Sequence, residues 1–154
     1  MTRVLFVCLG NICRSPTAHG VFEQKIKAQG LDKRIEVDSA GTASWHQGNP
    51  PDSRSIRAAK GRGYALDHLR ARQVTVSDFD QFDYILAMDA NNLADLEVMC
   101  PAHFTGHLGL FLSFGCASEK EVPDPYHGGE AGFQHVLDLV EDACDGLIQD
   151  IVSR

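Results

Sequence analysis

The stretch Arg3–Pro16, RVLFVCLGNICRSP, decides the fold. Its first five residues are rich in the apolar and β-branched types that fill a buried strand of a parallel sheet. The following residues are mostly small or polar, and Pro16 then opens a helical pattern, in a position where the first turn of a helix tolerates proline. An apolar stripe continues that helix toward a predicted end at Gly30. Strand, loop and helix together form the first unit of an α/β fold.

The rest of the chain repeats this alternation. Further strands are predicted at residues 35–39, 84–87 and 107–110, and helices at 52–61, at 91–98 and from Phe133 almost to the C-terminus. The pattern predicts an α/β fold with a four-stranded parallel sheet flanked by helices in three layers, doubly wound as in flavodoxin. Since no repeat or linker interrupts it, the whole chain, residues 1–154, is predicted to be one domain.

Composition and charge exclude several classes of protein. The chain is 44% hydrophobic and 23% charged, with 14 glycines and 6 prolines, which excludes collagen, coiled coils and disordered chains. The net charge of −7 argues against a nucleic acid or an anionic membrane surface as the main partner. No apolar run approaches the ~20 residues of a membrane span, and none near the start suits a signal peptide. We therefore expect a cytoplasmic protein without membrane insertion.

The five cysteines are expected to be reduced thiols. None of them pairs in the C-x-x-C spacing of a zinc site, and a cytoplasmic location keeps thiols reduced. No metal or cofactor is therefore expected, and a reduced cysteine is available for chemistry.

The loop that follows the first strand, CLGNICRS at residues 8–15, has the composition of an anion site. Ligands of open parallel sheets bind beyond the carboxyl ends of the strands, and amides that curl into a helix N-terminus form an anion nest. Gly10 allows close approach of the backbone, and Asn11 is the non-glycine residue best suited to a positive φ. The predicted phosphate-binding residues are Leu9, Gly10, Asn11, Ile12, Cys13 and Ser15.

Two side chains of this loop carry the predicted chemistry. Arg14 offers a planar fork that matches two oxygens of a phosphate. Cys8 lies at the base of the nest, where Arg14 and the helix dipole both favour the thiolate. Ser15 can donate a hydrogen bond to the sulfur. Cys8 is thus a candidate nucleophile and Arg14 a candidate phosphate ligand.

The same stretch, VLFVCLGNICRSPTA, resembles the signature of the low-molecular-weight protein tyrosine phosphatases. The similarity continues over most of the chain, in DSAGT at 38–42, ARQ at 71–73, FDYILAMD at 82–89 and DPY at 124–126. The resemblance implies hydrolysis of phosphotyrosine in proteins or peptides, and of small aryl phosphates, without a metal. Phosphate-like anions are the expected inhibitors.

The resemblance also implies a general acid, which the residues alone do not choose among 21 carboxylates. Asp124 stands out modestly because Pro123 and Pro125 stiffen its loop, and the family motif then assigns it the acid and base roles. In the implied reaction Cys8 forms a phosphocysteine while Arg14 holds the phosphoryl oxygens.

Further roles are implied by the resemblance alone. Trp45 and Tyr126 are expected to flank the substrate cleft, with Leu9 and Ile12 at its lip. Ser39 is expected to support the loop by a hydrogen bond to Asn11, and Cys13 to form a disulfide that protects Cys8 from over-oxidation.

Two positions depart from the family pattern. Leu69 stands where members commonly carry a histidine, with His68 one place earlier, and His127 stands where several carry a second tyrosine. No role is predicted for either histidine.

Two other functions stay open at this point. A thiol-dependent arsenate reductase would use the same loop but needs further cysteines, for which only Cys100 and Cys116 are distal candidates. A phosphoprotein-binding module would keep the nest without turnover, although the complete set of Cys8, Arg14, Ser15 and Asp124 argues against it.

Overall fold

The computed structural model describes all residues, 1–154, and confirms the predicted parallel sheet. Four strands pair in the order β2-β1-β3-β4, with bounds β1 Thr2–Cys8, β2 Ile35–Gly41, β3 Tyr84–Ala87 and β4 His107–Leu110. The helices are α1 Arg14–Ala28, α2 Ser53–Lys60, α3 Asp78–Gln81, α4 Ala90–Met99 and α5 Glu130–Val152, with a 3₁₀ helix, η1, at Phe111–Phe114.

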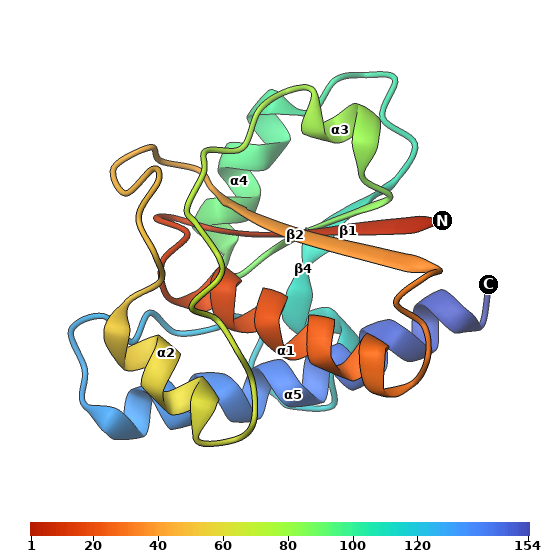
Figure 1. Ribbon diagram of the computed structural model, residues 1–154. Coiled ribbons are helices and arrows are strands. Elements are labelled where there is room, and N and C mark those ends of the chain that lie inside the picture. The colour runs from red at the N-terminus through yellow and green to blue at the C-terminus, as the bar shows by residue number, and fades with distance from the viewer.

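The sheet is the middle of three layers, as predicted. Helices α1, α2 and α5 lie on one face and α3 and α4 on the other (Figure 1). Successive side chains of β1 point to opposite faces: Val4, Phe6 and Cys8 join the larger core beneath α1 and α5, whereas Leu5 and Val7 join the smaller core with α4. This alternation places the Cys8 side chain on the α1 face, directly after the fully buried residues Val4–Val7.

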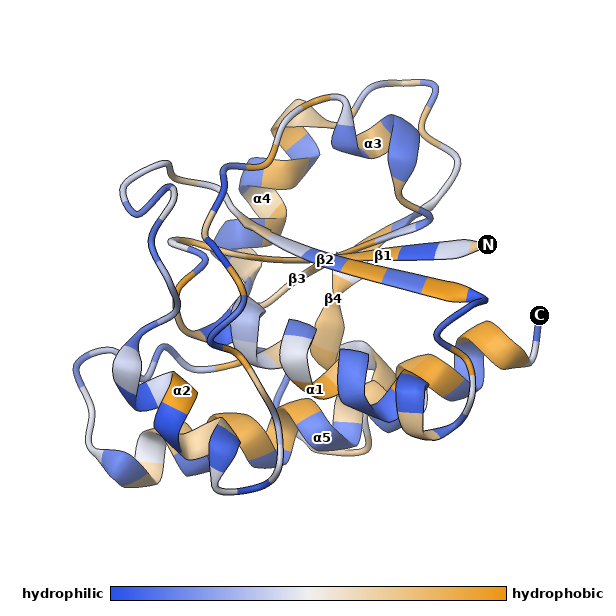
Figure 2. Ribbon diagram, viewed as in Figure 1, coloured by the Kyte–Doolittle hydropathy of each residue, from blue (hydrophilic) through white to orange (hydrophobic).

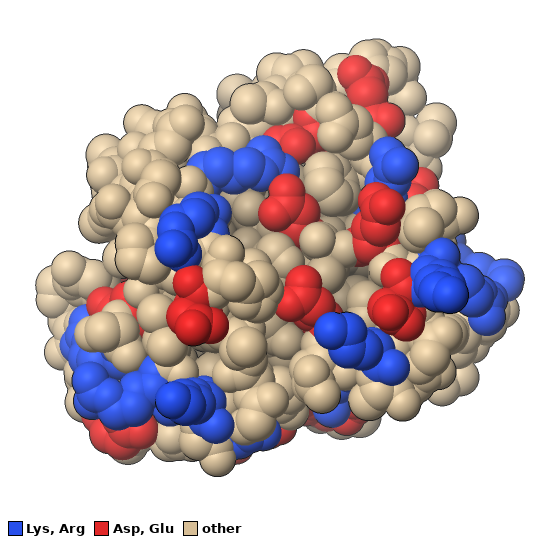
Figure 3. Space-filling view, in the orientation of Figure 1, with Lys and Arg blue, Asp and Glu red and all other residues tan.

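The hydropathy of each element follows its place in the layers. Apolar and polar bands alternate along β2, as expected for an edge strand, whereas α5 carries a broad apolar stripe (Figure 2). Acidic and basic side chains are interspersed over the face that Figure 3 shows, without a large area of one sign. The structure contains no helix with both the length and the apolarity of a membrane span.

The start of the first helix differs from the prediction. α1 begins at Arg14, two residues before Pro16. The first amides of a helix have no acceptor within the helix, so a proline in the first turn removes no hydrogen bond and does not set the start. The amides of Arg14 and Ser15 therefore belong to the helix N-terminus, at the carboxyl edge of the sheet.

Candidate active site

A cavity of about 250 Å³ opens beyond the carboxyl end of β1. Three segments far apart in the sequence line it: the Cys8–Ser15 loop, the loop containing Trp45 and His46, and the Asp124 loop, which we define as Pro123–Gly129. The predicted site residues that line this one cavity are Cys8, Leu9, Gly10, Ile12, Cys13, Arg14, Trp45, Asp124 and Tyr126.

The backbone of the Cys8–Ser15 loop presents donors that no protein group uses. From Leu9 to Ser15, only the amide of Asn11 donates a hydrogen bond within the protein, and its acceptor is the Cys8 sulfur. Carbonyl groups of the loop are held from outside, since Thr42 donates to Cys8, Ala43 to Leu9 and Asp52 to Ile12. Six amides thus remain free to bind an anion, which is the nest that the sequence predicts.

The Cys8 sulfur is buried and receives hydrogen-bond donors. Its side chain lies 3.2 Å from the Asn11 amide nitrogen and 3.0 Å from the Ser15 hydroxyl oxygen, and the residue is only 3% exposed. The Asn11 side chain donates its amide to the Ser15 oxygen at 2.7 Å. The Ser15 oxygen accepts in that contact, and its hydrogen can be donated to the Cys8 sulfur at 3.0 Å or to the more distant Ala40 carbonyl at 3.4 Å. Hydrogen bonds of this kind are strongest when the acceptor carries a negative charge.

Asn11 has the left-handed backbone that the sequence predicts, with φ of 58°. Its side-chain oxygen accepts from the Arg72 amide at 3.1 Å, which fixes the orientation of the amide group. The Arg72 side chain is itself clamped by Asp38 at 3.0 Å and by the buried Asp78 at 3.1 Å. The ion pairs of Arg72 thereby hold the segment that supports Asn11.

The predicted hydrogen bond from Ser39 to Asn11 is wrong. The Ser39 hydroxyl instead pairs with Nδ1 of His19, a buried residue of α1, at 2.9 Å. The Asn11 side chain contacts Ser15 and Arg72 instead. The sequence analysis missed His19 and Arg72 as supporting residues, and only the ARQ motif pointed toward the second.

Arg14 is held inside the protein by an acidic partner. Its Nη1 donates to Asp89 at 2.7 Å and to the carbonyl of Val122 at 3.2 Å. Burial by itself would lower the pKa of the guanidinium, but the facing Cys8, Asp89 and Asp124 outweigh it, so its pKa is raised. Arg14 therefore stays charged, and Asp89 fixes its orientation. The sequence analysis did not select Asp89.

Replacing Asp89 with asparagine should loosen Arg14 and lower stability. Asparagine can still accept from the Asn92 amide as the cap of α4, so the change removes mainly the charge opposite a buried arginine. We expect a loss of about 3 kcal/mol in the free energy of unfolding, together with weaker binding of inorganic phosphate. Urea unfolding and phosphate titration measure both effects. The exposed Asp95 of the same helix is the matched control, and equal behaviour of Asp89→Asn and Asp95→Asn would contradict the assignment.

Asp124 and the aromatic walls lie opposite the Cys8–Ser15 loop. The Asp124 carboxylate is half exposed, 4.0 Å from Nη2 of Arg14, and its Oδ1 accepts from the Tyr126 amide at 3.1 Å. Trp45 is 72% exposed and Tyr126 is 40% exposed at the mouth of the cavity. Both rings are thus free to contact a ligand.

The two cysteines of the loop differ in environment. Burial raises the pKa of Cys13 to about 12, partly offset by the Ser55 hydroxyl, so that Cys13 is a thiol at neutral pH. Both Cys8 and Cys13 are free thiols in this structure, and the protective disulfide stays a prediction. His46 and His127 also line the cavity although no sequence spacing singled them out.

Similarity to known proteins identifies the family of this chain. The family described as low molecular weight phosphotyrosine protein phosphatase matches residues 3–154. The chain belongs to this family. It is 45% identical over 151 residues to the Schizosaccharomyces pombe member, covering 97% of this chain and 96% of the relative. It is 42% identical over 152 residues to YfkJ of Bacillus subtilis, covering 98% and 96%.

A solved structure extends the likeness to the whole fold. The protein tyrosine phosphatase of Entamoeba histolytica, with Hepes in its active site, superposes with a TM-score of 0.96 at 44% identity, covering 99% of this chain and 98% of that one. The family is one of phosphatases, so the chain is a member of an enzyme family of hydrolases.

The arsenate reductase alternative is not favoured for this member of the phosphatase family. The relatives and solved structures described above are tyrosine phosphatases. Neither Cys100 nor Cys116 lines the cavity with Cys8, so neither is placed to relay a disulfide from it.

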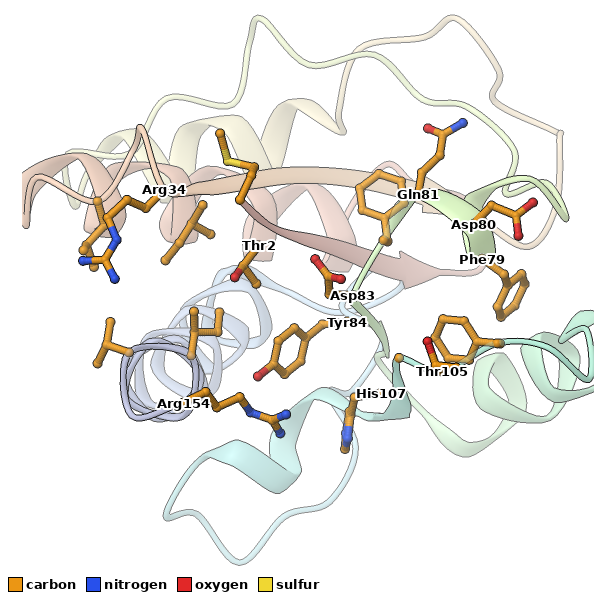
Figure 4. Close-up of a pocket in the computed structure, with 18 of the residues that line it drawn as sticks. Thr2, Arg34, Phe79, Asp80, Gln81, Asp83, Tyr84, Thr105, His107 and Arg154 are labelled. Atoms are coloured by element: carbon orange, nitrogen blue, oxygen red, sulfur yellow. The ribbon is translucent and has the colours of Figure 1, made fainter.

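A larger cavity, of about 800 Å³, lies at the amino end of the sheet, opposite the Cys8–Ser15 loop (Figure 4). Thr2, Asp83, Tyr84 and His107 line it at the amino ends of the strands, and Arg154 closes it from the end of α5. It contains none of the predicted site residues. Size alone therefore does not identify the active site of this phosphatase.

Proposed function

We propose that residues 1–154 act as one phosphatase domain that hydrolyses phosphotyrosine in proteins or peptides, and small aryl phosphates, through a phosphocysteine on Cys8. The observation that carries the proposal is the cavity in which the Cys8 sulfur, six unused loop amides, Arg14 and Asp124 converge. A tetrahedral dianion with one ester bond matches this arrangement, since the amides and guanidinium take its free oxygens.

In the first step the Cys8 thiolate attacks phosphorus in line with the ester bond. The S–P bond forms, the P–O bond to the aryl group breaks, and the Asp124 carboxyl proton passes to the departing phenolate oxygen. Arg14 and the loop amides stabilise the charge on the three equatorial oxygens.

In the second step the Asp124 carboxylate takes a proton from water as the water oxygen attacks phosphorus. The S–P bond breaks, inorganic phosphate leaves, and the thiolate of Cys8 and the carboxyl of Asp124 are restored. The Ser15 hydroxyl and the Asn11 amide stabilise the departing sulfur, because both already point at it.

Substrate choice follows from the depth of Cys8 in the cavity and from the aromatic side chains at the cavity mouth. Because Cys8 is buried, a phosphate must enter the cavity on an arm long enough to reach the sulfur. A phosphotyrosine ring spans this distance and can pack against Trp45 and Tyr126, whereas the phosphoserine side chain is too short. The partners are therefore tyrosine-phosphorylated proteins or peptides, and a cytoplasmic setting would keep Cys8 reduced.

A matched set of peptides tests this proposal. Peptides of one sequence that carry phosphotyrosine or phosphoserine at the same position should differ in kcat/KM by about 100-fold or more, because a phosphorus held even 1 Å out of place loses about that much rate. Phosphate release measures both rates. Comparable rates on the two peptides, or no release from either, would refute the proposal.

Two controls separate the remaining alternatives. Arsenate supplied with thioredoxin and a source of electrons should show no arsenite formation beyond the background without the protein. Binding of the phosphotyrosine peptide without any phosphate release would instead indicate a non-catalytic binding module.

A further inference from the structure

Arg54, in the first turn of α2, contacts Asp52 and the Asp124 loop. Its Nε and Nη2 each lie 3.1 Å from an oxygen of Asp52, so the two side chains form a bidentate pair. Asp52 also caps α2 by accepting from the Arg54 amide at 2.9 Å. The hydrogen bonds from Arg54 lower the pKa of Asp52, so the pair stays charged near neutral pH. The Arg54 guanidinium is consequently held in one place.

The Arg54 guanidinium lies over two aromatic rings. Its centre is 5.3 Å from the centroid of the Tyr126 ring and 4.9 Å from that of Phe133. Phe133 is a buried residue of α5, which packs against α2 (Figure 1). Tyr126 belongs to the Asp124 loop, and its amide donates to the Asp124 carboxylate. Arg54 thus joins the loop of the proposed acid to a fixed part of the core.

The Asp124 loop makes few polar contacts with the rest of the protein. The hydrogen bonds that its residues Pro123–Gly128 make are internal, from Tyr126 to Asp124 and from Gly128 to the carbonyl of Pro125. The ion pair with Arg14, at 4.0 Å, is long. Pro125 of this loop is buried. After Pro125, the ring contact with Arg54 ties the exposed Tyr126 to the core.

The same pair is also tied to the Cys8–Ser15 loop. The Asp52 amide donates to the carbonyl of Ile12 at 2.8 Å. A single unit, Asp52 with Arg54, therefore contacts the loop that carries the proposed nucleophile and the loop that carries the proposed acid.

We infer that Arg54 is a positioning residue. Held by Asp52, it contacts the Tyr126 ring and thereby sets the distance between Asp124 and the leaving-group oxygen. Because Asp124 is the proposed general acid, this role rests on the proposed function. Arg54 itself lies outside the residues that line the cavity and does not contact the phosphate.

The experiment compares Arg54→Met and Arg54→Lys with Arg57→Met, a control on the same helix whose side chain is exposed and makes no ion pair in this structure. Phenyl phosphate, a poor leaving group, and 4-nitrophenyl phosphate, an activated one, are the substrates. If Asp124 is displaced, the rate falls mainly for phenyl phosphate, whose leaving group needs a proton. Arg54→Met should therefore lose about 10-fold more kcat/KM on phenyl phosphate than on the activated ester. Arg54→Lys, which keeps the charge but not the flat fork, should lie between Arg54→Met and the parent.

A double-mutant cycle distinguishes positioning from general damage. In an Asp124→Asn background, Arg54→Met should add little further loss, because the group that it positions is already absent. Equal losses on both substrates, or losses that add to those of Asp124→Asn, would overturn the inference.

Hydrogen–deuterium exchange over residues 122–129 gives a readout that does not need turnover. Exchange in this segment should be faster in Arg54→Met than in the parent or in Arg57→Met. Faster exchange in a protein without phosphatase activity would support the contact and refute the proposed function, whereas unchanged exchange would refute the contact whatever the activity.

Discussion

The Cys8→Ser protein should lose hydrolysis of aryl phosphates by at least ~10⁴-fold, at every pH tested. Serine fits the same space, but its hydroxyl does not supply the anionic sulfur that the Asn11 amide and the Ser15 hydroxyl stabilise. The nest of amides and Arg14 remain, so inorganic phosphate should still bind. Initial rates with 4-nitrophenyl phosphate and a phosphate titration measure the two properties separately.

The control for this substitution is Cys116→Ser, at an exposed cysteine away from the cavity, which should match the parent. Rapid acid quenching of the parent during turnover should also trap a phosphoryl group on the peptide that contains Cys8. Turnover by Cys8→Ser at a rate near that of the parent, or a phosphoryl group trapped on another residue, would remove Cys8 from the mechanism.

The second large effect is expected at Asp124. Asp124→Asn cannot give a proton to the leaving phenolate, and general acid catalysis of this kind contributes about 10²–10⁴-fold. We expect a loss of that size on phenyl phosphate and a much smaller loss in the first step on 4-nitrophenyl phosphate, whose phenolate leaves without help. Burst kinetics separate that first step from hydrolysis of the phosphocysteine, which Asp124→Asn should also slow.

Asp67→Asn is the matched control for Asp124→Asn. Asp67 is an exposed carboxylate whose side chain makes no contact recorded in this structure, so both substrates should react at the parent's rate. If Asp124→Asn lost the same factor on both leaving groups, Asp124 would not be the acid, and a role in shaping the cavity would explain the loss.

The sequence-based predictions agree best with the structure where the interacting residues are close together in the chain. The order of strands and helices follows from short-range patterns, and the bounds of α2, α4 and all four strands lie close to the predicted ones. The Cys8–Ser15 loop is also local, since its nucleophile, its amides and its arginine lie within eight consecutive residues. Here the spacing alone determines which groups can surround one anion.

The predictions and the structure differ where a residue contacts a partner that is distant in the sequence. Ser39 was assigned to Asn11, yet His19 takes its hydroxyl. Asp89 stands 75 residues from Arg14 and reaches it only because β1 and β3 are neighbours in the sheet. Residue types and spacing do not report such contacts.

By itself the sequence determined that this chain folds as an α/β sheet with an anion nest and a cysteine after its first strand, because backbone periodicity and loop amides act over a few residues. Only the tertiary structure decided which groups support the site. Asp89 holds Arg14, the Arg72 amide holds the Asn11 side chain, and Arg54 contacts the loop of Asp124. Those contacts depend on how the helices and loops pack on the sheet, which arises from the whole core at once and not from any one segment.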